Sequence, residues 1–334
     1  MLRTLDDVIN KLKSAKRVLV IGHIKPDGDD ISSVATMVLI LRKIGKTAEG
    51  CIEDEIPWFY KNIPGVSEIK RVEQLRDYDY DTSVTVDASE ISRIGTSVEL
   101  LNGKKPDITL DHHKTNVGFG EIDFYDSNYA AAAVIVYEIA KKLGIKYDPS
   151  LAEINLLGIA TDTGFFKYSN ADSKVFRYAS ELIESGANIQ HISSAVLEHR
   201  TINEFKLFSE MVNTLKVEEN GKLAWAYVSA EMLKRHNCTD EDVKGFIGEV
   251  RSIYGVEVAI LFVEWPERQV NISFRSKNYV DVSEIAIAFG GGGHVRASGC
   301  SQKDVGLEEM IKKVIVKSRE VLKQYEAIPP SISL

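Results

Sequence analysis

Short apolar runs and longer amphipathic segments alternate along the first half of the chain. Residues 18–22 carry no charge, which is typical of a strand buried on both faces of a parallel sheet. Further strands are predicted at 47–51, 82–86 and 107–111, and helices at 2–16, at 31–43 and over an apolar segment from 154. This alternation predicts an α/β domain whose mainly parallel sheet is flanked by helices.

The second half of the chain begins with helical periodicity and then turns into a smaller α/β pattern. Helices are predicted at 173–186, 189–197, 203 to about 215, 239–249, 283–289 and 307–325, and strands at 223–229, 256–263 and 269–275. The turn at 265–268 joins the last two strands as a hairpin. We therefore expect a first domain at 1–190, a helical connector at 191–213, a smaller α/β domain at 214–328 and a loose tail at 329–334.

Composition narrows the functional classes. The chain has 334 residues, 44% of them hydrophobic, with a formal net charge of −8 and a pI of about 5.5. Proteins that bind long duplex nucleic acid through many phosphates are usually basic, so a small substrate is favoured. The three scattered cysteines fit a reducing cytoplasm, and no apolar run approaches a membrane span or a signal peptide. We expect a cytoplasmic protein with no membrane partner.

Acids and histidines stand at the ends of several apolar segments. They are His23, Asp27 and Asp29 after the first strand, Asp87 after another, Asp111, His112 and His113 after a third, and Asp162 after an apolar helical segment. Each group alone is typical of a helix cap or a polar loop. The carboxyl ends of parallel strands meet at one edge of a sheet, where α/β proteins bind ligands. The repetition therefore favours a common site.

The residue types at this edge suit a pair of hard divalent cations. Carboxylates with one or two imidazoles favour Mn²⁺, or Mg²⁺ or Fe²⁺, over zinc in a thiolate cage. Two such ions roughly 3.5–4 Å apart can share a water, lower its pKa and clamp the oxygens of a displacement at phosphorus. Enough ligands are supplied by His23, Asp27, Asp29, Asp87, His112 and Asp162.

Neighbouring residues are predicted to support these ligands. Pro26 and Gly28 provide a turn that lets Asp27 and Asp29 serve adjacent ions. Asp111 is expected to orient the ligand imidazole of His112 from behind. His113 is then left for contact with a phosphate.

A second group of anion-binding candidates lies in the smaller domain. Four glycines before His294 are expected to form an anion-binding loop whose backbone amides can approach an anion, and Arg296 and Ser298 follow them. Arg275, next to Ser276, supplies a guanidinium suited to a phosphate. The candidate substrate-binding residues are Arg275, Ser276, Gly291, Gly292, Gly293, His294 and Arg296. Two features stay open: Arg93 serves the reaction or holds an Asp or backbone group, and the aromatic residues at 56–65 form core or line a pocket.

The ordered motifs resemble those of the DHH phosphoesterases with a C-terminal DHH-associated domain. The motifs are His23-x-x-Pro26-Asp27-x-Asp29, Val86-Asp87-Ala-Ser89 with Arg93-x-Gly95, Asp111-His112-His113, Thr161-Asp162-Thr163-Gly164 and Gly290-Gly-Gly-Gly-His294-x-x-Ala297-Ser298-Gly299. In length the chain is similar to the group of bifunctional oligoribonucleases and 3′-phosphoadenosine-5′-phosphate phosphatases, also called nanoRNases. Some relatives of this size hydrolyse the linear dinucleotide pApA made from cyclic di-AMP.

The resemblance implies a role for each matching residue. One Mn²⁺ would bind His23, Asp27 and Asp87, and a second would bind Asp29, Asp87, His112 and Asp162, so that Asp87 bridges the ions. His113 would contact the scissile phosphate or assist the leaving group, and Arg93 belongs to the same catalytic set. Arg275 and the glycine run would bind the substrate terminus, and the chain would pair as a homodimer. The chain departs from the family pattern after the first motif. The family usually has Gly-Ser about three residues after the second Asp, whereas this chain has Ser32-Ser33 there and an additional acid, Asp30, next to Asp29.

These expectations describe an enzyme for very short nucleic acids. It would hydrolyse short oligoribonucleotides and pApA to mononucleotides, and 3′-phosphoadenosine 5′-phosphate to AMP, by two-metal activation of a bridging water. Substrate length would be measured between the metal-bearing domain and the anion-binding domain. The alternatives are a single-strand DNA exonuclease of the same superfamily, an inorganic pyrophosphatase, and a non-catalytic nucleotide-binding protein. The last would be marked by lost ligands, and none is missing.

Overall fold

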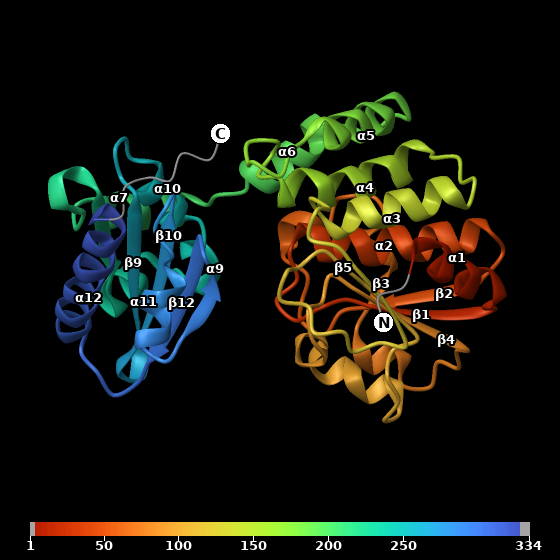
Figure 1. Cartoon of the computed structure of the whole chain (residues 1–334), viewed down its shortest axis with the longest axis horizontal. Coiled ribbons are helices and arrows are strands. Elements are labelled where there is room, and N and C mark those ends of the chain that lie inside the picture. Colours follow the sequence, from red (N-terminus) through yellow and green to blue (C-terminus); the bar gives the residue numbers. More distant parts are fainter. Residues whose placement is uncertain (1–3, 328–334) are drawn as a thin grey trace. The chain divides into compact units, whose positions relative to one another are not determined.

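A computed structural model describes residues 4–327, which divide into two compact units (Figure 1). The first unit ends at His199 and the second begins at Arg200. The break falls inside the connector expected at 191–213, so α6 (Ile189–Leu197) belongs to the first unit and α7 (Ile202–Val212) to the second. The tail expected at 329–334 lies outside the described residues.

The first unit is built on a six-stranded parallel sheet with the order β3-β2-β1-β4-β5-β6. Its strands are β1 (Arg17–Ile21), β2 (Thr47–Cys51), β3 (Ile69–Lys70), β4 (Thr82–Val86), β5 (Ile108–Asp111) and β6 (Ile122–Tyr125). Its other helices are α1 (Leu5–Ser14), α2 (Gly28–Lys43), α3 (Ala132–Lys142), α4 (Pro149–Asp162) and α5 (Ser173–Glu184), with 3₁₀ segments η1 (Trp58–Tyr60), η2 (Val66–Glu68), η3 (Val72–Leu75) and η4 (Ile91–Leu101). The strand order reverses between β1 and β4, and ligands bind at such a switch point.

Helices cover one face of this sheet and short 3₁₀ segments cover the other. In Figure 1, α2, α3 and α4 lie on one side of the strands, and the orange segment that contains η4 lies on the opposite side. The alternating side chains of β1 divide accordingly: Val18 and Val20 pack under the helices, whereas Leu19 and Ile21 pack against η3 and η4. Burial on both faces explains why β1 carries no polar position after Arg17.

The second unit is a mixed sheet covered by helices on both faces. Its strands are β7 (Lys216–Glu218), β8 (Leu223–Val228), β9 (Val258–Trp265), β10 (Gln269–Ser276), β11 (Gly292–His294) and β12 (Ala297–Gln302), in the order β11-β12-β10-β9-β8-β7. Its other helices are α8 (Ala230–His236), α9 (Asp240–Val243), α10 (Phe246–Ser252), α11 (Ser283–Ala288) and α12 (Leu307–Ala327), with 3₁₀ turns η5 (Glu219–Gly221) and η6 (Pro266–Arg268). The α11 and α12 helices pack on one face, and α7, α8 and α10 on the other.

The predicted fold class is confirmed, and two local predictions are wrong. The helix expected at 239–249 is two helices, α9 and α10, because the chain is interrupted at Gly245, a poor helix former. The glycine run is not a loop throughout, since Gly292–His294 forms the edge strand β11 paired with β12. The pattern also did not predict α3 or β6. Within residues 4–327, no helix combines the length and the apolar character needed to cross a bilayer.

We expect Gly158→Ala to destabilise the first unit. A Cβ at Gly158 of α4 would lie 2.6 Å from the Cβ of Ala133 and 2.6 Å from the Oγ of Ser32, both fully buried. Overpacking of this kind costs about 1–3 kcal/mol. Urea denaturation of the full-length protein, followed by circular dichroism, measures the loss. The matched control is Gly248→Ala in α10, where the space for a Cβ is open and no loss is expected. Equal stability of both variants would contradict the packing argument.

Candidate metal centre

The structure brings the six predicted ligands together at the carboxyl edge of the first sheet. His23 follows β1, Asp87 follows β4 and His112 follows β5, and the strands β1, β4 and β5 are adjacent. The end of α4 adds Asp162. Potential ligand atoms lie within 4.8 Å of one another in three groups: His23, Asp27 and Asp87; Asp29, His112 and Asp162; and Asp87, His112 and His113.

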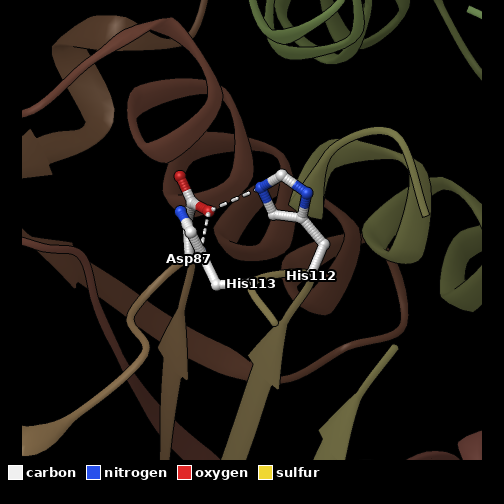
Figure 2. A group of neighbouring side chains, drawn as sticks. All are labelled: Asp87, His112 and His113. Atoms are coloured by element: carbon white, nitrogen blue, oxygen red, sulfur yellow. Dashed lines mark ion pairs between the residues drawn. The ribbon is translucent and has the colours of Figure 1, made fainter. Parts of the chain in front are cut away.

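Asp87 lies at the centre of the cluster. Its Oδ2 lies 3.5 Å from Nε2 of His23 and its Oδ1 lies 3.3 Å from Nε2 of His112. Figure 2 shows ion pairs from one oxygen of this carboxylate to both the His112 and the His113 ring. Its backbone is held at a φ of 56° by a hydrogen bond to the carbonyl of Leu110, a left-handed conformation that Asp tolerates better than most residues. Its Oδ1 is buried and receives no hydrogen bond of normal geometry, which fits an atom reserved for a cation.

Backbone carbonyls orient both ligand histidines. The Nδ1 of His23 lies 2.7 Å from the carbonyl oxygen of Ile24, and the Nδ1 of His112 lies 3.3 Å from that of Tyr129. A carbonyl beside Nδ1 favours a proton on that nitrogen, because the carbonyl only accepts hydrogen bonds. The Nε2 atoms, which face the carboxylates, are then the nitrogens with a lone pair that a metal ion could use.

The two acids of the first motif cap helices as well as joining the cluster. Asp27 is the N-cap of α2, and its Oδ1 accepts the N–H groups of Asp29 and Asp30 at 3.0 and 3.1 Å. Asp29 accepts the N–H groups of Ala132 and Ala133 at 2.6 and 2.8 Å. These two residues begin α3, whose own N-cap is an alanine that cannot serve. The same two carboxylates therefore cap helices and belong to the acid and histidine cluster.

Gly28 serves a different purpose from the predicted turn. It is the first residue of α2, and a Cβ there would lie 2.5 Å from the Oγ1 of Thr161 in α4. The glycine lets α2 and α4 approach closely, which places Asp29 and Asp162 at the same site. The irregular backbone lies earlier, at Lys25 with a φ of 54°.

Asp111 contacts a different histidine from the one predicted. Its Oδ1 lies 2.7 Å from Nδ1 of His113 and accepts the backbone N–H of His112, so it does not orient the His112 ring. The direction of the chain after β5 explains this, because the His113 ring turns back toward the strand end. Asn116 fixes Asp111 by donating to its Oδ2 at 2.6 Å. Sequence reasoning did not single out Asn116, although an amide soon after a cluster of charges is a signal for such support.

Two residues that depart from the usual motif are accommodated by glycines. Asp30 is fully buried, with Oδ1 accepting the backbone N–H of His23 at 2.9 Å and Oδ2 lacking a partner. It fits because a Cβ at Gly22 would lie 2.4 Å from its Oδ1. Ser32 fits in the same way against Gly158. Asp30 thus holds the backbone of a predicted ligand and adds negative charge behind it.

The charges at the site perturb one another strongly. Burial raises the pKa of Asp29 well above its usual value, helped by the charges of Asp87 and Asp162. Burial also opposes ionisation of Asp87, but His112 and His23 outweigh it and hold the pKa of Asp87 below its usual value. Burial alone would lower the pKa of His23, yet the surrounding acids, Asp30 first, raise it to about 10. In the metal-free protein, protons on the histidines and on some of the carboxyl groups therefore offset the negative charge of the cluster. A bound divalent cation would replace these protons.

Arg93 lies behind the first ligand histidine. Its Nη2 is 3.2 Å from Nδ1 of His23, and its backbone carbonyl accepts the N–H of Ile24 at 2.7 Å. The carbonyl contact holds the segment that follows β1. A guanidinium only donates hydrogen bonds, so it makes none to an Nδ1 that carries its proton toward the Ile24 carbonyl.

The candidates in the second unit lie around the end of β10 and the β11–β12 hairpin. Arg275 lies on β10 opposite Ala297 of β12, and its Nη1 donates to the carbonyl of Phe274. Ser276 is buried and donates to the carbonyl of Val280 at 2.7 Å. Arg296 donates to the carbonyls of Val280 and Asn278, so it braces the loop after β10. Residues 292–294 are exposed along the edge strand.

Family models match both units. The model described as the DHH family, N-terminal domain, matches residues 17–159, and the DHHA1 domain model matches residues 220–324. A bifunctional oligoribonuclease and PAP phosphatase NrnA from Thermus thermophilus is 31% identical over 307 residues, which cover 91% of this chain and 90% of that protein. The protein of the same name from Bacillus subtilis is 25% identical over 300 residues, covering 88% and 92%.

A solved structure shares the fold. The crystal structure of an exopolyphosphatase-related protein from Bacteroides fragilis superposes with a TM-score of 0.88 at 23% identity. The match covers 97% of this chain and 96% of that one.

We expect Asp30→Asn to change how the stability of the metal-free protein depends on pH. Burial raises the pKa of Asp30 to about 7 from 3.8. Because the folded value lies above the unfolded one, the stabilising contribution of the protonated carboxyl is complete below the unfolded pKa and is lost as the pH rises through the folded pKa. The difference of about 3 pKa units corresponds to about 4 kcal/mol. Relative to the Asn variant, the wild type should lose up to that amount between about pH 4 and about pH 7.5.

Urea denaturation in the presence of a chelator measures this difference. The control is Asp126→Asn, since Asp126 accepts hydrogen bonds from Asn128 in a surface turn outside the cluster. This control should follow the wild-type profile. Parallel profiles for the wild type and Asp30→Asn would show that Asp30 ionises in the folded protein as it does in the unfolded chain.

Proposed function

The chain belongs to the DHH family, and from this premise we propose that it is a metal-dependent phosphoesterase of very short nucleic acids. Its substrates are short oligoribonucleotides and linear dinucleotides such as pApA, which it hydrolyses to mononucleotides, and 3′-phosphoadenosine 5′-phosphate, which it hydrolyses to AMP. The relatives named as bifunctional oligoribonuclease and PAP phosphatase support this proposal, since they align with about nine-tenths of the chain. The observation that carries it is the acid and histidine cluster around Asp87.

The residues of the cluster fit a pair of hard divalent cations, and we propose Mn²⁺, with Mg²⁺ as the alternative. One ion would be held by His23, Asp27 and Asp87, and the other by Asp29, Asp87, His112 and Asp162. The buried Oδ1 of Asp87 and the Nε2 atoms that face it supply the donors. When bound, the ions lower the pKa of a water and offset negative charge at the phosphorus centre.

The chain's own groups prepare the remaining chemistry. His113 hydrogen-bonds to Asp111 through Nδ1, so a proton delivered to the leaving oxygen would come from Nε2. Burial lowers the pKa of His113, but Asp111 and Asp87 outweigh it and raise the pKa, which favours the protonated donor form. In the second unit, Arg275 and the exposed residues 292–294 would bind a substrate phosphate, with Ser276 and Arg296 shaping the adjoining loop. The predicted role of the Gly291 amide is not supported, because this N–H donates to the carbonyl of Ala286.

We further propose that the protein acts in the cytoplasm and pairs as a homodimer. Cys51, Cys238 and Cys300 are free thiols, which suits a reducing compartment. Ile202 and Phe205 on α7 leave apolar side chains exposed, and such groups are typical of pairing surfaces. Sedimentation equilibrium tests the pairing.

Asp87→Asn should abolish most of the activity while leaving the fold intact. Asparagine keeps the shape of the side chain and tolerates the left-handed backbone at position 87. It removes the negative charge that both ions would share, so we expect kcat/KM for pApA to fall by at least about 100-fold. Circular dichroism should remain unchanged, and the number of Mn²⁺ ions bound per chain, measured by calorimetry, should decrease.

Asp126→Asn is the matched control, because it removes a carboxylate near the same sheet edge without touching the cluster. Its turnover should equal that of the wild type. Near-full activity of Asp87→Asn with an unchanged metal stoichiometry would contradict the shared role of Asp87.

A substrate panel with Mn²⁺ tests the reaction class. We expect the highest kcat/KM for 5′-phosphorylated dinucleotides, a decline with each added nucleotide, and detectable hydrolysis of 3′-phosphoadenosine 5′-phosphate. Pyrophosphate and intact cyclic di-AMP should be poor substrates, since neither is a linear chain with a nucleotide to remove. A preference for long single strands would favour an exonuclease instead, and binding of nucleotides without any turnover would favour a non-catalytic protein.

A further inference from the structure

A small aromatic pocket in the first unit is not used by the metal cluster. The turn η1 and the helix α6 with its C-terminal extension line an open pocket of about 250 Å³. It is lined by Trp58, Phe59, Asn62, His191, Ser194, Ala195, Glu198 and His199. The segment 56–65 was left open in the sequence as core or pocket, and the structure divides it: Tyr60 and Ile63 are core, whereas Trp58 and Phe59 line the pocket.

The rings are arranged around one stacked pair. Phe59 and His199 stack with centroids 4.0 Å apart and an interplanar angle of 16°. Trp58 meets both rings edge to face, with centroids 5.9 and 6.2 Å away. The Trp58 side chain is nevertheless 61% exposed, so one large aromatic surface remains open to a ligand. An exposed indole braced by two other rings is a stacking platform that costs little conformational entropy to use.

The polar groups of the pocket suit a neutral flat ligand better than a phosphate. No Lys or Arg is among the lining residues, and Glu198 would repel an anion. Asn62 and Ser194 both donate and accept hydrogen bonds, and a carboxylate accepts them from an exocyclic amine. The Nδ1 of His199 is buried and has no hydrogen-bond partner in the protein. A planar group with an edge of donors and acceptors, such as a nucleobase, matches this set.

The turn that carries the pocket shares its core with the helix that carries two of the predicted ligands. Tyr60, in the same turn as Trp58 and Phe59, is buried in the same hydrophobic core as Ile31 near the start of α2. Asp27 is the N-cap of α2, and Asp29 lies in its first turn.

We propose that this pocket binds one nucleobase of the substrate, which stacks on Trp58 while the scissile phosphate lies at the metal cluster. The proposal rests on the proposed hydrolysis of dinucleotides and names the part of the substrate that this unit recognises. Stacking tolerates every base, because each has an aromatic face, so Trp58 selects for the presence of a base and not for its identity.

Steady-state kinetics of Trp58→Ala tests the proposal with pApA and two analogues, each lacking one of the two bases. Loss of one stacking contact should raise KM for pApA roughly 5- to 100-fold, with a smaller change in kcat. Trp58→Phe keeps a ring and should restore most of the affinity. One of the two abasic analogues should have the same KM with the wild type and Trp58→Ala, which identifies the base that the pocket holds.

Tyr254→Ala is the matched control, since Tyr254 is a fully exposed aromatic residue of the second unit. Its KM should equal that of the wild type. The proposal is overturned if Trp58→Ala leaves KM for pApA unchanged, or if it raises KM equally for pApA and for both abasic analogues.

A binding measurement separates this proposal from the proposed reaction. AMP should quench the tryptophan fluorescence of the wild type and not that of Trp58→Phe, whereas ribose 5-phosphate should quench neither. If AMP quenches the fluorescence but no dinucleotide is hydrolysed, the proposed reaction is refuted and the proposed base-binding pocket stands. If pApA is hydrolysed, AMP does not quench the fluorescence and KM is unchanged in Trp58→Ala, the proposed reaction stands and the base-binding pocket is refuted.

Discussion

The first unit is organised around the repulsion between several carboxylates at one edge of its sheet. The carboxyl ends of these parallel strands meet at one edge, and here the chain places a histidine after β1, an acid after β4, acids at the start of α2 and another at the end of α4. Burying several carboxylates at one point is unfavourable unless cations or protons compensate them. Divalent cations would supply this compensation at the groups of acids and histidines that surround Asp87.

Two of the predicted ligands also begin helices, and two others are oriented by backbone carbonyls. Asp27 begins α2, Asp29 begins α3, and carbonyls next to the strands fix the tautomers of His23 and His112. Glycines at close approaches make this possible, because α2 and α4 could not come together over a larger residue at position 28 or 158. Catalytic geometry and fold stability therefore depend on the same contacts.

Much of this architecture follows from the sequence, for physical reasons that can be named. Apolar runs that end on acids indicate strands of a parallel sheet, and the convergence of His23, Asp87 and His112 follows from strand adjacency. The pattern did not indicate α3, since an alanine-rich segment without a cap residue carries no start signal; its cap comes from Asp29, about a hundred residues earlier. The partner of Asp111 depends on side-chain direction at a strand end, which no spacing rule determines. The break at Gly245 follows from the poor helix propensity of glycine, which the apolar periodicity does not register. The pairing of Gly292–His294 depends on a tertiary contact with β12 that overrides local preference.

The double use of Asp29 has a consequence for dynamics. Its carboxylate accepts hydrogen bonds from the first two N–H groups of α3. A cation bound by the same carboxylate would change the strength of these hydrogen bonds, and with it the stability of the first turn of α3. The amide protons of Ala132 and Ala133 are consequently natural reporters of the state of the site, and their exchange with deuterated solvent would register occupancy without any substrate. Amide exchange in α3, a helix that carries none of the predicted ligands, would thereby report whether a cation is bound.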